Sequence, residues 1–245
     1  MEGNNSAKMS VPLDKVPVEA HYSHWIAQET IDFIEDPMRD QDKPFYFMSN
    51  FFDPHHPFGA PDAVRALFDA DTLPLPSGSP AEMDNRPEVL RAYSKRSYAG
   101  VAPGFQEYSE AEIREVVASY YAMVALLDAE IGRILATLEQ RGELENTLVV
   151  FTSDHGEMLG DHGLLLKGPM LYEPVVRVPL ILHQPGTVPK GVRIPRPVQT
   201  LDLTSTILAA AGAPDAFAKQ GSDLMPLALD PAGPWRDWAL SEYRD

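Results

Sequence analysis

The 245-residue sequence contains no cysteine, no long apolar run and few basic residues, and each absence excludes a class of protein. Without cysteine there is no disulfide framework, no thiolate metal site and no cysteine nucleophile. No segment approaches the roughly 20 apolar residues that span a bilayer, and the N-terminus lacks the apolar core of a signal peptide. With 36 acidic and 20 basic residues the net charge is −16, which repels a phosphate backbone. We therefore expect a chain that binds neither nucleic acid nor a membrane. As written the sequence is that of a cytoplasmic chain, and it leaves the compartment of the parent protein undetermined.

The length and the 44% hydrophobic content fit one large α/β domain. The strongest helix pattern begins at Ser109, where Glu112 completes a capping box, and ends before Gly142. Residues 60–106 are rich in Pro, Gly, Ser and Asp without a sustained period, which predicts a long surface excursion. The periodicity predicts helices around 24–34, over 109–141 and over 202–211, and strands over 44–52, 147–152 and 178–183.

Helices that alternate with buried strands predict a mostly parallel sheet sandwiched by helices. In such sheets, functional side chains gather beyond the carboxyl ends of the strands. Two polar clusters follow predicted strands, DPHHP at 53–57 and DHGE at 154–157. A carboxylate and an imidazole that leave one strand end together can bind a divalent cation. Each cluster also has a plain structural explanation, because DHG fits a tight turn and the two histidines between prolines fit a rigid loop.

Residues 148–182, LVVFTSDHGEMLGDHGLLLKGPMLYEPVVRVPLIL, carry several motifs in a fixed order. A strand leads into Ser-Asp-His-Gly-Glu, a glycine-rich loop follows, Lys167 comes 12 residues after His155, and Arg-Val-Pro-Leu begins a second strand. This order closely resembles the sulfatase family of the alkaline-phosphatase-like superfamily. PHHPF at 54–58 is similar to the family's substrate-contacting histidine segment. The resemblance covers nearly the whole chain and implies an alkaline-phosphatase-like α/β fold.

The resemblance also implies roles for particular residues. Asp154 and His155 are expected to bind a divalent cation, usually Ca²⁺ in sulfatases and sometimes Mn²⁺ in related phosphonate and phosphodiester hydrolases. Lys167 and His55 are expected to contact the oxygens of the sulfuryl or phosphoryl group. A cation, a lysine and a histidine stabilise the charge that builds during displacement, and His55 can also protonate the departing alkoxide.

The other histidines near these motifs have weaker claims. We assign His162 to the substrate pocket or to its supporting shell, because it lies in the glycine-rich loop between His155 and Lys167. We interpret His56 as structural.

Parts of the family pattern are absent. The family's nucleophile is a Cys or Ser in Cys/Ser-x-Pro-x-Arg that is converted to formylglycine, and this sequence has no such segment. The paired aspartates that complete the metal site and a Gly-Lys-Trp-His segment are missing too. RDWALSEYR at 236–244 resembles the opening strand of a small C-terminal subdomain. We therefore expect a fold truncated at the N-terminus and in that subdomain, with a partial domain over 1–235 and the subdomain's start over 236–245.

The resemblance implies a parent enzyme that hydrolyses sulfate monoesters, with a small-molecule sulfate ester as its substrate. Two protein ligands leave a calcium site half built, so we expect this chain alone to be inactive. A phosphonate monoester or phosphodiester hydrolase of the same fold also fits the motifs, and so does a non-catalytic remnant that binds anions or a partner protein. Absent central strands would leave an exposed sheet edge, which predicts pairing with another chain.

Overall fold

The computed structural model describes residues 9–13, 15–78, 80–100, 102–168, 170–213 and 220–242. Its contacts divide the chain into two compact units. The first unit is Met1–Asp40, Tyr46–Thr137 and Glu157–Val175, and the second is Gln41–Phe45, Leu138–Gly156 and Val176–Asp245. None of the described helices is long and apolar enough to cross a membrane. Each unit is described by itself below.

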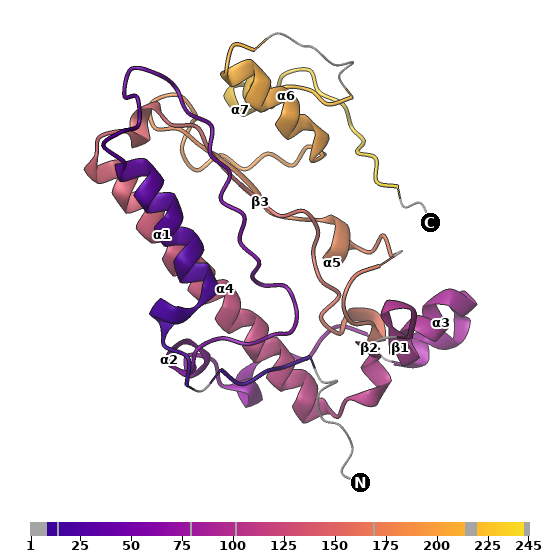
Figure 1. Ribbon diagram of the computed structural model, residues 1–245. Helices are drawn as coiled ribbons and strands as arrows, with labels where there is room; N and C mark the ends of the chain where they lie inside the picture. The colour runs from indigo at the N-terminus through magenta and orange to yellow at the C-terminus, as the bar shows by residue number, and fades with distance from the viewer. Residues whose placement is uncertain are drawn as a thin grey trace. The chain divides into compact units, whose positions relative to one another are not determined.

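The first unit is organised by α4, Glu110–Gln140, the longest helix in Figure 1. The predicted capping box is present: Ser109 N donates to Glu112 Oε2 at 2.9 Å, and Glu112 N donates to Ser109 Oγ at 3.3 Å. Gly142 follows the helix with a φ of 67°, a left-handed conformation that glycine adopts without steric cost. The sequence prediction for this helix is confirmed.

Helix α1, Tyr22–Glu35, lies alongside α4 and confirms the helix predicted around residues 24–34. Its buried face includes Ala27, Ile31 and Ile34. Polar contacts add to this packing, because His24 Nδ1 lies 2.9 Å from Glu130 Oε1 and Arg133 donates to Gln28 at 2.6 Å. Glu130 is only 2% exposed, so this carboxylate is taken out of water together with its partners.

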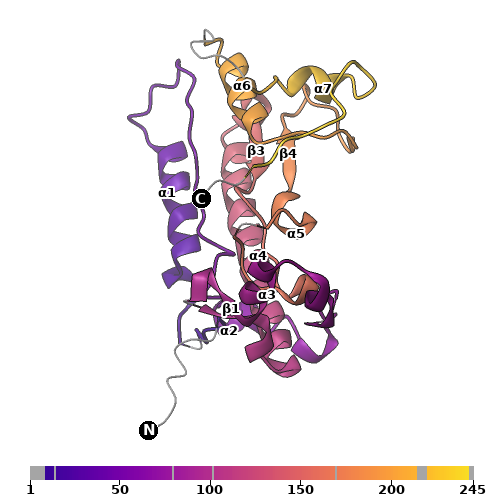
Figure 2. The same cartoon turned by 90° about the vertical axis from the view of Figure 1, so that its right-hand side faces the viewer.

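The segment 60–106 is less superficial than the sequence predicts. Ala60, Met83, Tyr93 and Ala102 are buried in two hydrophobic clusters of the first unit. Met83 lies in a 3-10 turn and Tyr93 in a short helix, whereas Ala60 lies in irregular chain and Ala102 in a two-residue strand. Elements this short produce no readable period in the sequence. The elements here are α2 (Asp62–Arg65), α3 (Glu88–Lys95), β1 (Arg96–Ser97), β2 (Ala102–Pro103) and 3-10 turns at Ala70–Thr72, Pro80–Asn85, Tyr98–Gly100 and Phe105–Glu107, several of them visible in Figure 2.

The buried strand predicted over residues 44–52 is wrong. The segment is extended, but it forms no strand, and Tyr46, Met48 and Phe52 are 64%, 62% and 53% exposed. It is held on the side of α1, where Ser49 Oγ lies 2.8 Å from Thr30 Oγ1 and the ring of Phe47 stacks on Phe33. A strand needs a hydrogen-bonding neighbour, and within the described residues none lies beside this segment.

The second unit is built on a two-stranded sheet of β3, Val149–Thr152, and β4, Leu180–His183, as the sequence predicts within a few residues. The pair is antiparallel, with Val149 opposite His183 and Thr152 opposite Leu180. In the described part of the chain β1 and β2 also pair antiparallel, and parallel contact is limited to two isolated bridges. β4 begins at the end of the sheet where β3 stops, so the two strands run in opposite directions. A parallel pair would need a crossover connection to the other end of the sheet.

Helix α6, Leu201–Ala210, confirms the predicted helix over 202–211 and is held by a buried carboxylate. Asp202 is 0% exposed and accepts hydrogen bonds from Gln199 N and Ser222 N, both at 2.8 Å. Both of its oxygens also accept from the Arg236 guanidinium, whose Nη1 lies 3.1 Å from Oδ1. Arg236 thus belongs to the second unit, and the domain boundary proposed after residue 235 stays a prediction. The remaining helices are α5 (Glu173–Val176), α7 (Met225–Leu229) and 3-10 turns at Val18–Ala20, Leu144–Asn146 and Asp161–Gly163.

Candidate functional site

The loop that carries His55 and His56 is attached to α1 through Asp53. This carboxylate is 5% exposed and accepts hydrogen bonds from the Tyr22 hydroxyl and from Ser23 Oγ, the latter at 2.5 Å. His21 Nδ1 lies 3.8 Å from the same carboxylate and accepts from Ser23 N at 3.2 Å, which caps the start of α1. The start of the helix and the histidine loop are therefore fixed to each other.

Burial dominates the protonation equilibria of this cluster. It raises the pKa of Asp53, and the hydroxyls of Ser23 and Tyr22 and nearby His21 oppose that rise by favouring the carboxylate. Burial also lowers the pKa of His21, against the pull of Asp53 and Glu130. His21 Nε2 is buried and has no hydrogen-bond partner among the described residues. A charged imidazole would be costly here, so the folded state favours neutral His21.

We expect this imidazole to make the protein acid-sensitive. Because the pKa of His21 is lower in the folded state than its ordinary 6.5, the unfolded chain binds more protons, and stability falls as pH drops through 6.5 toward the folded pKa. His21→Asn keeps a capping acceptor and removes the titration. Urea unfolding of both proteins between about pH 7.5 and about 5.5 should show a shallower decline in the variant. The raised pKa of Asp53 acts in the opposite direction in both proteins, so equal slopes would contradict the role assigned to His21.

The structure joins His55 to Lys167 through His56. The rings of His55 and His56 stack with centroids 4.1 Å apart, and His55 Nδ1 donates to His56 O at 2.6 Å. His56 Nδ1 in turn lies 3.4 Å from Lys167 Nζ, so the ammonium donates to the ring. His55 therefore has its Nε2 lone pair available, whereas neutral His56 carries its proton on Nε2. The interpretation of His56 as a structural residue does not anticipate its contact with Lys167.

Tyr98 is a further member of this group, and no sequence signal pointed to it. Its ring centroid lies 5.6 Å from Lys167 Nζ and 5.2 Å from the ring of His56. Burial, followed by the nearby Tyr93 and Glu157, raises the pKa of Tyr98 to about 12. The phenol therefore stays neutral near neutral pH and offers its ring face to the ammonium. Tyr98 lies in the irregular segment 60–106, so its position beside Lys167 is visible only in the structure.

Backbone strain is concentrated around Lys167. Four described non-glycine residues have a positive φ: Tyr98 at 47°, Leu159 at 48°, His162 at 56° and Leu166 at 66°. Three of them belong to the loop that ends at Lys167, and the fourth contacts its ammonium group. Such conformations cost roughly 1–3 kcal/mol each and persist where surrounding packing enforces them. Leu164, Leu165 and Leu166, all 0% exposed, supply that packing.

Two glycines let other segments approach this loop closely. A Cβ on Gly160, whose φ is 101°, would lie 2.5 Å from Pro76. A Cβ on Gly168 would lie 2.7 Å from the Tyr93 hydroxyl, which donates to Lys167 O. Larger residues at either position would push the segment 60–106 away from the lysine.

His162 holds that same segment against the loop. Its Nδ1 lies 3.1 Å from Glu82 Oε2, its ring stacks on Tyr172, and its backbone N donates to Ser77 O at 2.7 Å. Asp161 accepts from Ser77 N at 2.6 Å and completes the junction. These contacts anchor the segment, and a substrate-binding role for His162 stays a prediction.

Asp154 and His155 follow β3 in the second unit, as predicted. His155 Nδ1 lies 2.9 Å from Gly156 O and donates to it, which leaves the Nε2 lone pair available. That nitrogen lies 3.6 Å from Asp154 Oδ2, and the other carboxylate oxygen accepts from His155 N at 2.9 Å. Asp154 is exposed, with its side chain 84% accessible. One imidazole nitrogen and one carboxylate oxygen thus face the same point.

These two side chains fit part of a divalent-cation site. The described residues contain no group of three or more His, Cys, Asp or Glu side chains that could hold a metal ion. Calcium takes about six to eight oxygens, so water or further protein groups would have to complete the shell. The donor set of one nitrogen and one oxygen does not discriminate between calcium and manganese.

Solved structures with the same fold define the class of this protein. The phosphonate monoester hydrolase of Agrobacterium radiobacter gives a TM-score of 0.82 at 26% identity, over 97% of this chain and 47% of that one. A protein solved with its substrate D-glucosamine-2-N,6-O-disulfate gives a TM-score of 0.69 at 25% identity, over 89% of this chain and 54% of that one. The predicted alkaline-phosphatase-like α/β fold is confirmed.

Sequence comparison gives the family. The sulfatase family profile matches residues 2–213, and the arylsulfatase of Clostridium perfringens is 30% identical over 227 residues, which are 91% of this chain and 45% of that protein. The chain belongs to the sulfatase family. It spans about half the length of the relatives it matches.

Proposed function

We propose that this chain supplies the cation- and anion-binding residues of a hydrolase that acts on sulfate monoesters. The observation that supports this most is the group of Lys167, His56 and His55, in which the ammonium at the end of a strained, tightly packed loop adjoins two imidazoles from the 53–57 loop. Positive charge and N–H donors held in this way suit an anionic, tetrahedral group. The family's relatives include an arylsulfatase, which agrees with this substrate class.

Each residue has a task that follows from its hydrogen bonds. The Lys167 ammonium stabilises the negative oxygens of the ester, and neutral His56 donates from Nε2. His55 exchanges a proton at Nε2, because His56 O occupies its Nδ1 proton. Tyr98 lines the group without adding negative charge that would repel the ester. A divalent cation on Asp154 and His155 would supply Lewis-acid stabilisation of a sulfuryl oxygen.

A phosphonate monoester is the second candidate substrate. The two phosphonate monoester hydrolase structures match this chain with TM-scores of 0.78 and 0.82. Phosphonate and sulfate esters present similar tetrahedral anionic groups, so the same lysine and histidines serve both.

The anion-binding half is tested by titrating the purified chain with inorganic sulfate while following the histidine ring signals by NMR. We expect saturable shifts of the His55 and His56 rings and a roughly 10- to 100-fold weaker affinity in Lys167→Met, because one charge-assisted hydrogen bond contributes about 1.5–3 kcal/mol. The matched control is Lys95→Met, an exposed lysine on α3. Equal affinities in the two variants would contradict the role of Lys167. Phenylphosphonate in the same titration compares the two ester classes.

The cation-binding half uses the same samples with calcium or manganese followed by calorimetry. Saturable binding by the wild type that is lost in Asp154→Asn and retained in Asp161→Asn would support the assignment of Asp154. Asp161 provides a fair control because its carboxylate also lies in a loop and accepts a backbone hydrogen bond. Binding that survives Asp154→Asn, or no binding by the wild type, would contradict a cation site built by this chain.

A further inference from the structure

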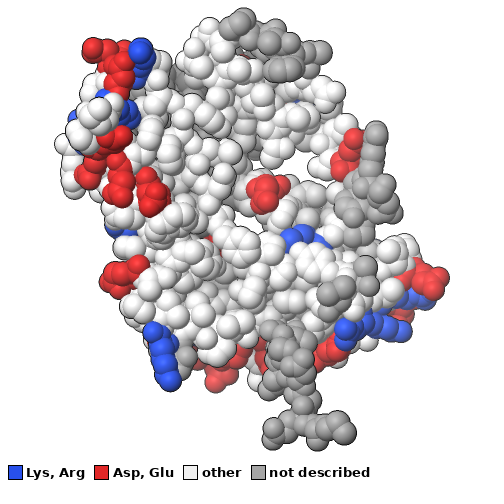
Figure 3. All heavy atoms as spheres, in the orientation of Figure 1, with Lys and Arg blue, Asp and Glu red and all other residues white. Residues whose placement is uncertain are grey.

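A second cationic surface lies outside the residues assigned above. Between Glu173 and Asp202 the sequence contains no acidic residue, although the whole chain carries a net charge of −16. The same stretch contains Arg177, Lys190 and Arg193 as well as other basic residues. Figure 3 shows acidic side chains at several places on one face of the molecule. Such local charge segregation marks a surface suited to anions.

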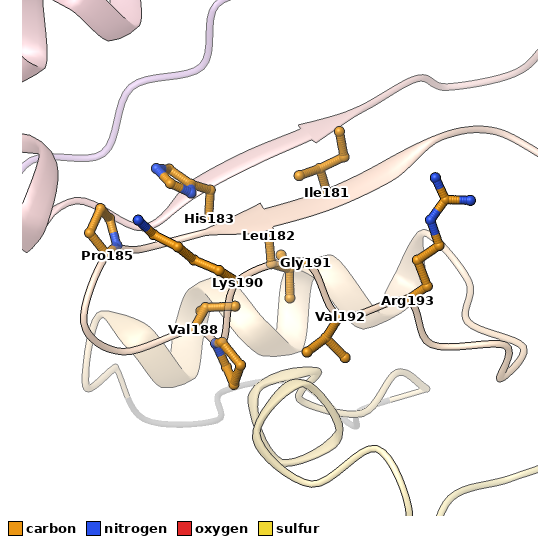
Figure 4. Close-up of a pocket in the computed structure, with 10 residues that line it drawn as sticks. Ile181, Leu182, His183, Pro185, Val188, Lys190, Gly191, Val192 and Arg193 are labelled. Atoms are coloured by element: carbon orange, nitrogen blue, oxygen red, sulfur yellow. The ribbon is translucent and has the colours of Figure 1, made fainter.

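This stretch folds into a groove beside β4. The cavity has a volume of about 390 Å³ and runs between β4 and the turn that follows it. Figure 4 shows Leu182, Val188 and Val192 along its apolar floor.

The two ends of the groove are cationic. Lys190 reaches toward His183 at one end, and Arg193 extends at the other, near Ile181 (Figure 4). Both basic side chains are exposed. Within the described ranges, neither Lys190 nor Arg193 has an ion-pair or hydrogen-bond partner. Their charges are therefore available to a ligand.

The register of the sheet places this groove relative to the candidate metal ligands of the same unit. His183 pairs with Val149, whereas Leu180 pairs with Thr152, which leads directly to Asp154. The groove thus runs along β4 from the far end of the sheet toward the end at which Asp154 lies. At about 3.3 Å per residue, the four-residue strands separate the two ends by roughly 10 Å.

We propose that the groove is a secondary binding site for a sulfated oligosaccharide. Sulfate groups on neighbouring sugars bind Lys190 and Arg193, and the C–H faces of the sugar rings cover Val188 and Val192. A ligand with several anionic groups separated by less polar rings matches two cationic ends joined by an aliphatic floor. A single small anion would use only one end. The choice of ligand class rests on the proposed function, whereas the existence of an anion-binding groove does not.

The test is calorimetric titration of the full chain with a heparin-derived hexasaccharide. We expect Lys190→Ala/Arg193→Ala to weaken its binding at least tenfold. The control Arg91→Ala/Lys95→Ala removes two exposed charges from α3 and should leave affinity within about twofold, because α3 does not line the groove. General attraction to a charged protein depends on total charge and would be weakened equally by the two double variants. Equal losses in the two double variants would overturn the groove as a site.

Inorganic sulfate separates this inference from the proposed function. Lys167→Met should weaken sulfate binding and leave the groove's share of hexasaccharide binding in place, whereas Lys190→Ala/Arg193→Ala should leave sulfate-induced shifts of the His55 and His56 rings unchanged. If Lys167→Met has no effect on sulfate while the groove variant still loses the hexasaccharide, the proposed function fails and the groove stands. A neutral dextran of similar length that binds as tightly as the sulfated hexasaccharide would overturn the charge-based recognition.

Discussion

Replacing Asp53 with alanine is expected to lower the free energy of unfolding by about 2–4 kcal/mol, since it leaves one buried and one partly buried hydroxyl donor without their acceptor, at about 1–3 kcal/mol for a fully buried donor. The donors are Tyr22 and Ser23 at the start of α1. The variant should also lose sulfate binding, because His55 and His56 lie two and three residues after Asp53 in the loop that Asp53 anchors. Urea unfolding followed by circular dichroism measures the first effect, with an unchanged m-value as the sign of a folded-state cause.

Two companion variants separate the buried contacts of Asp53 from a general effect of removing a carboxylate. Asp53→Asn keeps one oxygen acceptor of the same size and should recover much of the loss. Asp32→Ala removes an exposed carboxylate of α1 that accepts a hydrogen bond from Gln28, and it should change stability by no more than about 0.5 kcal/mol. An Asp53→Ala protein as stable as Asp32→Ala would show that the cluster does not hold the histidine loop.

Local sequence signals predicted the parts of the fold that local interactions create. The capping box at Ser109 and the glycine at 142 determine where α4 begins and ends, and both act within a few residues of the chain. Strands β3 and β4 were recognised from short apolar runs, a signal that is also local in sequence. The segment 44–52 has an equally apolar run, but none of the described residues forms a strand beside it, and a sequence pattern does not report whether a partner is present.

The candidate site was only partly predictable for a related reason. The family resemblance proposed Asp154, His155 and Lys167 as site residues, since each follows a recognisable strand or loop, and their roles stay predictions. Tyr98 was not identifiable, because its approach to Lys167 depends on the path of the whole segment 60–106. The anchoring of Asp53 by residues about 30 positions earlier is likewise a tertiary contact. Residues that act at a distance in sequence carry no local signature.

The buried ion pair of the second unit should be its most sensitive point. Asp202→Ala is expected to destabilise this unit by about 3–5 kcal/mol, because it leaves the Arg236 guanidinium uncompensated in a largely buried position. It also removes the acceptor of two backbone N–H groups that join α6 to the segments on either side. Trp235 and Trp238 flank the guanidinium, so tryptophan fluorescence during urea unfolding reports on this unit. All variants carry Trp25→Phe, which removes the tryptophan signal of the first unit.

Two further variants decide whether the ion pair itself is responsible. Asp202→Ala/Arg236→Met removes both charges, and it should be less destabilised than the sum of the two single variants, because neither charge is then left unpaired. Glu110→Ala breaks an exposed pair with Arg114, at 3.0 Å on α4, and should cost less than about 1 kcal/mol. If the double variant instead loses as much as both single variants together, the two residues act independently, and Asp202 stabilises α6 through its backbone hydrogen bonds alone.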